Sequence, residues 1–355
     1  MKIRTVTFFK EYNCGAVLQA YALSRYLGSI GNGVEILNYD PFYESEKKTI
    51  HNAKDFLLVP YRILRERNFK SFRDKYLSLS KEVFSKQDLE DLEDCDLYIT
   101  GSDQVWNPHL THGYDDIFFL NFDTSAAKMS YSASYGRDDI SEEYIGRVKE
   151  YTKEYCAVSV RENNLKECLE KVGVRAQYTV DPVFLLDADH YRSISKRCSD
   201  DRYLLIYTKS QTDDIWEFAR RIAEKLNLKI IDTSKIQKMK GVDKVRPLIN
   251  PPDFLGLIDG ADIVLTNSFH GTAFSIIFNK NFYCLSAGKA NVRLESLLSL
   301  TGLESRMIQD MDVDLQDIDY SYTNEKMDEF VSQSKVYIHE GIEKAKRYRN
   351  ENNNA

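Results

Sequence analysis

The chain has 355 residues, of which 43% are hydrophobic and 29% are charged. This length suits two domains rather than one compact core, and the composition excludes a disordered chain. The formal net charge of −7 argues against nucleic acid as the main partner, because a phosphate backbone favours a basic surface. No apolar run approaches the roughly 20 residues that span a membrane, so we expect a cytoplasmic protein.

The six cysteines are scattered along the chain and include no CxxC pair. This spacing predicts buried free thiols rather than disulfides or a zinc site. The sequence contains no other clustered set of metal-ligand residues, so we expect no metal site.

Short apolar runs alternate with longer amphipathic stretches in the first half, as in α/β proteins with parallel sheets. Residues 3–9, 15–27 and 34–39 predict a strand, a helix and a strand, which together form a right-handed β-α-β unit. A charged, aromatic-rich insertion at about residues 41–84 is predicted to be helical. The remaining strands of this half are predicted at residues 97–100, 128–131, 157–161 and 177–180.

A second set of elements begins near residue 203. The polar residues 186–201 have no strong period and predict a linker before it. The last helix, at about residues 324–349, is long and charged, and we expect it to fold back on the first domain. Strands are predicted at residues 203–208, 229–233, 263–266 and 282–285, and helices at 214–226, at 252–258 and from His270 onward.

These elements predict two Rossmann-like domains that face each other across a cleft. The first domain is expected at residues 1–190, including the helical insertion, and the second at residues 200–323, with residues 324–355 as the returning helix. Ligands of such sheets bind at the carboxyl ends of the strands. The residues that follow each strand are therefore the candidates for the functional site.

The strongest local pattern is T-N-S-F-H-G-T at residues 266–272, where an apolar strand leads into a helix. A helix N-terminus attracts anions, and Gly271 lets a ligand approach the backbone closely. Ser268, Gly271 and Thr272 are accordingly candidates for an anion site. His270 has two interpretations: it donates a proton or a hydrogen bond to a ligand, or it packs against the sheet beside a capped helix.

A second strand end carries G-S-D-Q-V-W-N at residues 101–107. Tryptophan suits stacking on a sugar ring, while aspartate and asparagine bind hydroxyl groups, so this stretch is a candidate sugar site. The alternative is a tight turn with Asp103 as a cap. The candidates for sugar binding here are Ser102, Gln104, Trp106 and Asn107.

Three cationic residues are candidates for anion binding. Arg161 ends a buried strand and suits bidentate binding of a carboxylate or phosphate, and the alternative is a salt bridge to Glu162 or Asp181. Lys289 and Arg293 lie four residues apart and share a face if the segment is helical. They either complete an anion site beside the histidine or form a solvated helix face.

The loop after the first strand supplies two further candidates for acceptor binding. Asn13 suits a helix N-cap, and Gly15 permits close approach of a ligand. Neither a G-x-G-x-x-G fingerprint nor a P-loop occurs in the chain, so nucleotide cofactors of those kinds are unsupported.

Taken together, five motifs resemble the polysaccharide pyruvyl transferase family: N-C-G-A-V-L-Q-A-Y-A-L, G-S-D-Q-V-W-N-P, S-V-R-E, V-D-P-V-F-L-L and N-S-F-H-G-T. They occur in the family's order and span about residues 10–306. The resemblance implies a GT-B-like fold and phosphoenolpyruvate as co-substrate, with no other cofactor. It also implies a sugar acceptor, galactose or another hexose of a bacterial surface or capsular polysaccharide precursor, on which a pyruvate ketal forms as phosphate is released.

By this resemblance, His270 matches the histidine placed at the donor, and Arg161 is a candidate for the arginine that holds the donor's carboxylate or phosphate. Some members have an arginine where this chain has Ser268, and Arg293 or Lys289 is the proposed substitute.

The chemistry suits these residue types, because an imidazole can hold and release a proton near neutral pH. We expect His270 to protonate the C3 methylene of phosphoenolpyruvate, after which a sugar hydroxyl attacks C2. Asp103 is expected to orient the acceptor or to remove its proton.

Alternatives remain for the surface and for the reaction. The basic, aromatic-rich residues 61–76 are either a solvated helix or a contact with an anionic membrane, where a lipid-linked acceptor would be found. Because one fold supports many functions, a nucleotide-sugar glycosyltransferase and a non-catalytic glycan-binding protein are the rival functions.

Overall fold

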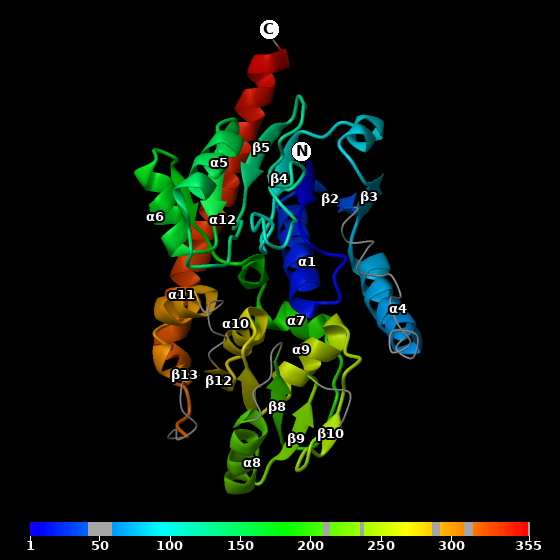
Figure 1. The fold of residues 1–355 in the computed structure, drawn as a ribbon, viewed down its shortest axis with the longest axis vertical. Helices are drawn as coiled ribbons and strands as arrows, with labels where there is room; N and C mark the ends of the chain where they lie inside the picture. The colour runs from blue at the N-terminus through cyan, green and yellow to red at the C-terminus, as the bar shows by residue number, and fades with distance from the viewer. Residues whose placement is uncertain (42–58, 209–213, 235–237, 286–291, 309–314, 354–355) are drawn as a thin grey trace. The chain divides into compact units, whose positions relative to one another are not determined.

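The computed structural model describes residues 1–41, 59–208, 214–234, 238–285, 292–308 and 315–353 (Figure 1). The chain divides into two compact units, each built on a parallel sheet with helices. Unit 1 comprises Met1–Val59, Arg73–Leu185 and Glu329–Ala355, and unit 2 comprises Pro60–Phe72 and Leu186–Asp328.

Unit 1 contains a seven-stranded sheet in the order β3-β2-β1-β4-β5-β6-β7, in which neighbouring strands are parallel. The strands are β1 Lys2–Val6, β2 Gly33–Tyr39, β3 Leu79–Val83, β4 Leu97–Thr100, β5 Ala127–Ser130, β6 Tyr155–Val160 and β7 Ala176–Tyr178. The helices are α1 Cys14–Ser29, η1 Gln87–Asp91, α5 Glu142–Thr152, α6 Asn163–Lys171, η2 Pro182–Leu185 and most of α12 Tyr320–Asn353.

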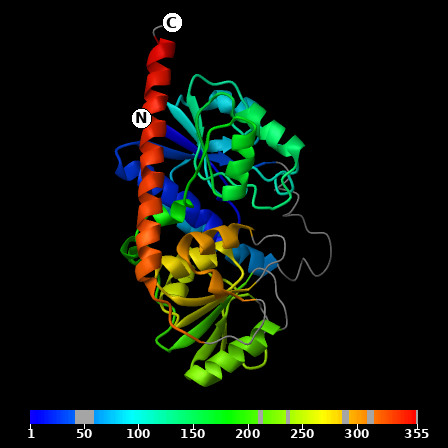
Figure 2. The same ribbon diagram turned by 90° about the vertical axis from the view of Figure 1, so that its left-hand side faces the viewer.

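Both faces of this sheet are covered by helices. Successive side chains of a strand point to opposite sides, so neighbouring residues of one strand contact different helices. Tyr98 of β4 and Val158 of β6 belong to the core that includes residues of α5 and α6. Met129 of β5 and Ala157 of β6 lie on the other face, against Gly341 of α12. Figure 2 shows α12, in orange and red, as one continuous helix.

Unit 2 contains a six-stranded parallel sheet in the order β10-β9-β8-β11-β12-β13. The strands are β8 Tyr203–Tyr207, β9 Lys229–Asp232, β10 Lys244–Val245, β11 Ile263–Thr266, β12 Asn281–Leu285 and β13 Met307–Ile308. The helices are α7 Ala188–Ile194, α8 Asp214–Leu226, α9 Pro251–Asp259, α10 Phe269–Ile277, α11 Val292–Thr301 and η4 Glu304–Arg306.

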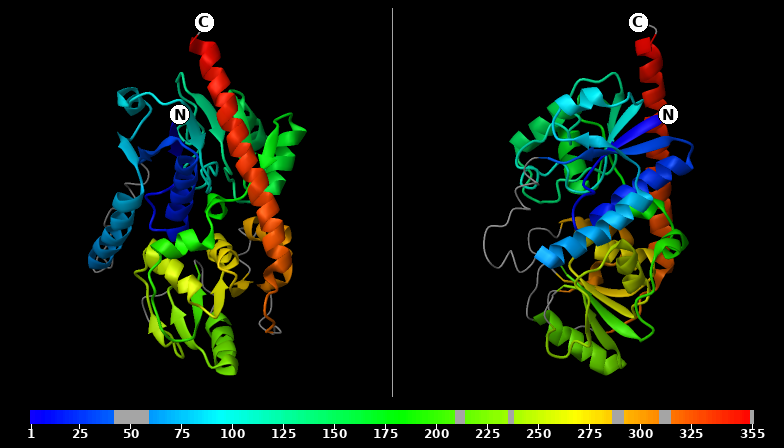
Figure 3. Two further views of the ribbon diagram at one scale, coloured as in Figure 1. Left: turned by 180° about the vertical axis from the view of Figure 1, so that it is seen from behind. Right: turned by 90° about the vertical axis from the view of Figure 1, so that its right-hand side faces the viewer.

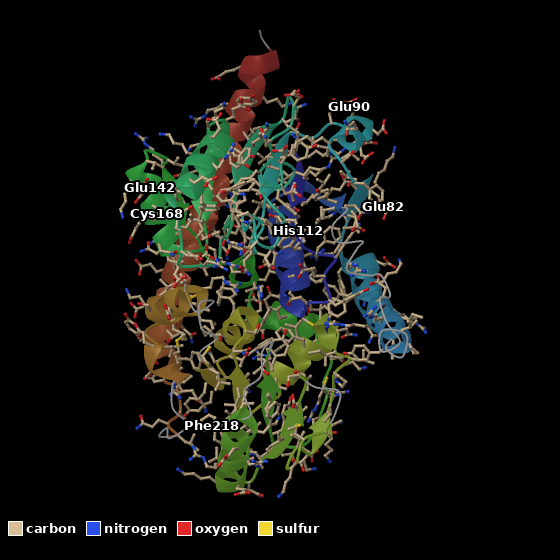
Figure 4. The ribbon with its side chains drawn as sticks, in the orientation of Figure 1. Glu82, Glu90, His112, Glu142, Cys168 and Phe218 are labelled. Carbon is tan, nitrogen blue, oxygen red and sulfur yellow. The ribbon has the colours of Figure 1, made fainter. Side chains whose placement is uncertain are left out.

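The sheet of unit 2 is also covered on both faces. Ile206 of β8 packs in a core cluster with Phe218 of α8, which is labelled in Figure 4. The next residue, Tyr207, contacts Phe254 of α9 with ring centroids 4.8 Å apart, and Phe254 contacts Phe274 of α10 at 5.4 Å. The adjacent residues Ile206 and Tyr207 thus face opposite sides of the sheet, with α8 on one face and α9 and α10 on the other (Figure 2).

The last helix returns to the first part of the chain, as the sequence predicted. The Tyr337 hydroxyl of α12 donates to the carbonyl of Ser130 at 2.7 Å, and Ser334 Oγ accepts from the Val180 N–H at 3.0 Å. The helix begins at Tyr320, four residues before the predicted start, and its first turns belong to unit 2.

Other predictions need correction. The predicted linker at residues 186–201 contains helix α7, whose N-cap Asp187 accepts from the His190 N–H at 2.7 Å. The insertion contains a helix, α4 Val59–Tyr76, but also strand β3, and Pro60–Phe72 belongs to unit 2. The edge strands β10 and β13 were missed because they have only two residues each, and β3 was missed because its sequence LSKEV is largely polar and lies within the predicted helical insertion. Residues 42–58 lie outside the described part.

The cysteines agree in part with the prediction of buried free thiols, because three of the six are only partly buried. All six cysteines are free, and Cys14, Cys95 and Cys284 are buried. Among the described helices, none combines the length and the apolar character needed to cross a membrane.

The contact between α9 and the segment after α7 yields a stability prediction. A Cβ at Gly256 would lie 1.9 Å from the carbonyl oxygen of Lys196, so Gly256→Ala forces two backbone segments apart. We expect this variant to lower the free energy of unfolding by about 3 kcal/mol, measured by urea denaturation.

Gly146 of α5 is the matched control, because a Cβ there meets nothing within 4 Å. Gly146→Ala should stabilise the protein slightly through helix propensity. Equal effects of the two variants would contradict the close approach at Gly256.

Candidate active site

The strand order of unit 1 reverses beside β1, and ligands of open α/β sheets bind at such a point. Helix α1 begins here. Asn13 is its N-cap, and Asn13 Oδ1 accepts from the Gly15 N–H at 3.1 Å. The structure therefore places both predicted acceptor residues of this loop at the strand-order reversal.

Gln19 of α1 connects this loop to the next one and was not predicted from the sequence. Its side chain is fully buried, and Nε2 donates to Thr7 Oγ1 at 2.9 Å and to the Phe8 carbonyl at 3.0 Å. Thr7 Oγ1 in turn donates to the Ser102 carbonyl at 2.6 Å. Gln19 thus fixes the loops that follow β1 and β4 against one helix.

The loop after β4 holds most of the predicted acceptor residues and continues past the exposed His112 (Figure 4). Asp103 has a φ of 72°, a left-handed conformation that costs free energy for most residues and is tolerated best by Asn and Asp. Asn107 Nδ2 donates to Gln104 Oε1 at 2.9 Å. The side chain of Gln104 lies against Gly136, where a Cβ would come within 2.4 Å of Oε1.

Trp106 is not the sugar platform that the sequence suggested. Its side chain is fully buried, and its ring stacks on Phe119 with centroids 5.4 Å apart and an interplanar angle of 8°. Its carbonyl accepts from the Tyr144 hydroxyl at 3.1 Å. Trp106 is therefore a core residue that anchors the loop. The prediction was wrong because the residues around Trp106 in the sequence are mostly polar, so nothing in the sequence indicates that this position is buried.

Arg161 follows β6 and lies at the centre of a buried polar network. Its Nη1 donates to Asp181 Oδ2 at 2.6 Å and to Ser102 Oγ at 3.2 Å, and its Nη2 donates to Ser134 Oγ at 3.0 Å. Ser102 also donates to Asp181 at 2.9 Å. One guanidinium thus joins the loops that follow β4, β5 and β6 to the segment after β7.

Three carboxylates surround this guanidinium. Besides Asp181, Asp103 Oδ1 lies 3.7 Å from Nη2, and Glu162 Oε1 lies 3.6 Å from Nε. Arg161 is 3% exposed, and the carboxylates of Asp103, Glu162 and Asp181 belong to residues that are 7%, 1% and 2% exposed. Burial disfavours the charge of Arg161, but the attraction of the carboxylates outweighs it and raises the arginine pKa. The salt-bridge alternative for Arg161 is therefore present in the structure.

In unit 2 the corresponding reversal lies beside β8, where α10 begins. Ser268 is the N-cap of α10, and Ser268 Oγ accepts from the Gly271 N–H at 3.5 Å. A Cβ at Gly271 would lie 2.3 Å from Thr266 Oγ1 and 3.0 Å from Tyr207 Cδ1, so only glycine fits there. His270 is 2% exposed in the first turn of this helix.

The remaining donor candidates are Thr272, Arg293 and Lys289, and the structure describes the first two. Thr272 is fully buried, and its Oγ1 lies 3.2 Å from Cys284 Sγ, so its side chain is a core contact rather than part of a ligand site. Burial raises the pKa of the Cys284 thiol to about 11. The Arg293 guanidinium lies 6.0 Å from the centre of the Phe269 ring, at the start of α10, whereas Lys289 lies outside the described residues.

The structure thus assembles two groups of predicted residues. In unit 1 it brings together Arg161, Ser102 and Asp103, and in unit 2 it brings Arg293 to the helix start that holds His270 and Ser268. Ser134 and Gln19 were missed as partners of these groups, whereas Glu162 was predicted as a possible salt-bridge partner of Arg161. The only sequence signal for Ser134 is that it follows strand β5.

Comparison with known proteins identifies a family over most of the chain. The family model described as polysaccharide pyruvyl transferase matches residues 13–288. This range contains every predicted site residue except Lys289 and Arg293. No curated protein sequence matches the chain.

Solved structures resemble the chain in fold. The UDP-GlcNAc 2-epimerase of Methanocaldococcus jannaschii matches with a TM-score of 0.51 and 12% identity, over 93% of this chain and 93% of that chain. The S. aureus MnaA structure with UDP matches with a TM-score of 0.51 and 11% identity, over 96% and 90%. The UDP-GlcNAc 2-epimerase of Neisseria meningitidis, bound to UDP-GlcNAc, matches with a TM-score of 0.50 and 10% identity, over 96% and 94%. These likenesses show a GT-B-like fold and nothing of the substrate.

The Arg161 network predicts a large stability effect. Arg161→Met removes the cation that pairs with three buried carboxylates, so we expect the free energy of unfolding to fall by about 3–5 kcal/mol. Arg161→Lys keeps the charge but loses the planar guanidinium fork. Its free energy of unfolding, measured by urea denaturation, should lie between those of the wild type and the methionine variant.

Arg137 provides the control in the same unit, because it pairs with Asp139 at the surface. Arg137→Met should leave the urea midpoint nearly unchanged. A methionine variant at position 161 as stable as the wild type would show that the network does not hold unit 1 together.

Proposed function

Because the chain belongs to the polysaccharide pyruvyl transferase family, we propose that it transfers the enolpyruvyl group of phosphoenolpyruvate to a hexose of a bacterial surface or capsular polysaccharide precursor. The observation that carries the proposal is the family match over residues 13–288. Galactose is the first acceptor to test. Phosphoenolpyruvate acts as co-substrate, and the reaction needs no further cofactor.

The proposed reaction conserves atoms and charge. A proton adds to C3 of phosphoenolpyruvate, and C2 gains positive character. One sugar hydroxyl bonds to C2, the bond between C2 and the phosphate oxygen breaks, and a second hydroxyl of the same sugar closes the ketal. Of the two protons that the hydroxyls lose, one replaces the proton delivered to C3 and the other leaves with phosphate.

We assign the donor to the start of α10 in unit 2. The N-terminus of this helix carries the positive end of the helix dipole, which favours an anionic group of the donor. His270 is the proposed acid that protonates C3. Arg293, which lies over the neighbouring Phe269, is the proposed cationic contact for the phosphate or carboxylate.

We assign the acceptor to the loops of unit 1. Asn13, Gln104 and Asn107 are the proposed hydroxyl ligands, and Asp103 is the proposed group that orients the sugar or accepts its proton. The contacts of Arg161 support a positioning role for it, because they hold Ser102 and the Asp103 backbone turn. Direct binding of the donor by Arg161 stays a prediction.

The test is phosphate release from phosphoenolpyruvate by the purified protein, with galactose, glucose and mannose acceptors. We expect release that depends on the acceptor, with a matching gain of pyruvyl mass on the sugar. His270→Ala should lower kcat by about 10²–10⁴-fold, as for loss of a general acid.

His339 is the control, because it is exposed on α12 and lies 3.4 Å from the Tyr26 hydroxyl in unit 1. His339→Ala should retain the wild-type rate. Full activity of His270→Ala would remove it as the acid. Binding of a uridine or guanosine diphosphate sugar, together with no binding of phosphoenolpyruvate, would instead favour a glycosyltransferase.

Arg293 has a separate kinetic prediction. Arg293→Gln should raise the KM for phosphoenolpyruvate by about 10-fold or more and leave the KM for the sugar unchanged, because a charged hydrogen bond to the donor is lost. Arg221 is the matched control, since its guanidinium lies 5.8 Å from the centre of the Phe218 ring in the same kind of contact. Arg221→Gln should leave both KM values unchanged, and equal effects of the two variants would contradict the assignment.

A further inference from the structure

Helix α4 has one face that packs on unit 2. The Tyr61 hydroxyl donates to the Pro247 carbonyl at 3.0 Å, and Asn68 Nδ2 donates to the Leu248 carbonyl at 3.4 Å. Phe69 lies on the same side and is 1% exposed. These positions are seven and eight residues apart, which is the spacing of one helical face. Figure 3 shows α4, in light blue, as a single helix.

The opposite face of α4 is exposed and carries both apolar and basic residues. Ile63 and Leu64 are 64% and 45% exposed, and they are the only consecutive pair of large exposed hydrophobic residues in the described part of the chain. Arg67 and Lys70 are exposed three to seven residues further on, so they share this face. Single exposed apolar residues are common on protein surfaces, but a pair at one end of a basic face is a feature of interaction surfaces.

The charge of α4 is opposite to that of the whole chain. Val59–Tyr76 contains six Lys or Arg residues and two acidic residues, a formal net charge of +4, whereas the chain as a whole has −7. A local positive field of this kind attracts an anionic surface although the protein as a whole is acidic. The described residues contain no helix able to cross a membrane, so contact with a membrane through α4 would be peripheral.

We propose that the outer face of α4, formed by Ile63, Leu64, Arg67 and Lys70, binds the surface of an anionic phospholipid bilayer. The two apolar side chains enter the boundary between headgroups and acyl chains, and the arginine and lysine reach the phosphate groups from the same face. A helix of 18 residues is about 27 Å long and lies along the surface rather than through it. Charge complementarity selects anionic lipid over neutral lipid.

This inference does not depend on the proposed reaction, because it concerns a helix whose residues have no part in the donor or acceptor assignments. If both the membrane contact and the proposed reaction hold, the reaction takes place at the membrane surface. An enzyme bound to an anionic bilayer would encounter lipid-linked sugars in the plane of that bilayer, whereas soluble sugars would reach it from solution.

The experiment is co-sedimentation of the full chain with vesicles of phosphatidylglycerol and phosphatidylcholine, compared with vesicles of phosphatidylcholine alone. We expect binding to the anionic vesicles at low salt and its loss at high salt, because screening shortens the reach of surface charges. The double variant Ile63→Asp and Leu64→Asp should reduce binding at least 10-fold, since the membrane affinity rests on buried apolar area as well as charge. Arg67→Gln alone should reduce it about fivefold.

Val336 provides the matched control, because it is an apolar residue of α12 with 53% exposure. Val336→Asp should bind vesicles as the wild type does. The proposal is overturned if anionic vesicles do not sediment the wild type, or if Val336→Asp weakens binding as much as the α4 double variant. Retention on immobilised polyglutamate without vesicle binding would also overturn it, in favour of an acidic protein partner.

Discussion

The buried contact between Arg161 and Asp181 is the interaction on which the geometry of unit 1 depends. The guanidinium lies 2.6 Å from this carboxylate and also reaches Ser102 and Ser134, so it ties together the loops at the ends of four strands. A buried charge of this kind is costly unless every partner is in place. The positions of Ser102 and Asp103 therefore depend on the strand ends around them, and a site built on them inherits the rigidity of the sheet.

The start of α10 in unit 2 is fixed by a different constraint, which is steric. Gly271 fits between Thr266 and Tyr207 because it has no Cβ, and this places the first turn of the helix close to strands β8 and β11. Ser268 then satisfies an N–H of the turn from the N-cap position. Electrostatic pairing thus orders the candidate site of unit 1, and close packing orders that of unit 2.

The sequence predicts the central strands and most helices because their apolar periods are long and regular. It fails at β10 and β13, which have only two residues each, and at α7, whose short polar sequence has no period to detect. Strand-end positions also identify Arg161, Asp103 and His270 as candidates. They cannot show that Trp106 is buried, because burial depends on Phe119, which is thirteen residues away and follows a turn.

The order of the chain has a consequence for synthesis. The helix that covers one face of the unit 1 sheet, through Tyr337 and Gly341, follows the strands of both sheets in the chain and is synthesised after them. On the ribosome, Met129 and Ala157 remain uncovered on that face until all of unit 2 has been translated. Unit 2 can complete its own core first, apart from the turns of α12 that it includes. The sheet of unit 1 can therefore be covered only after unit 2 has been synthesised, and until then its uncovered face is the surface that a chaperone would protect.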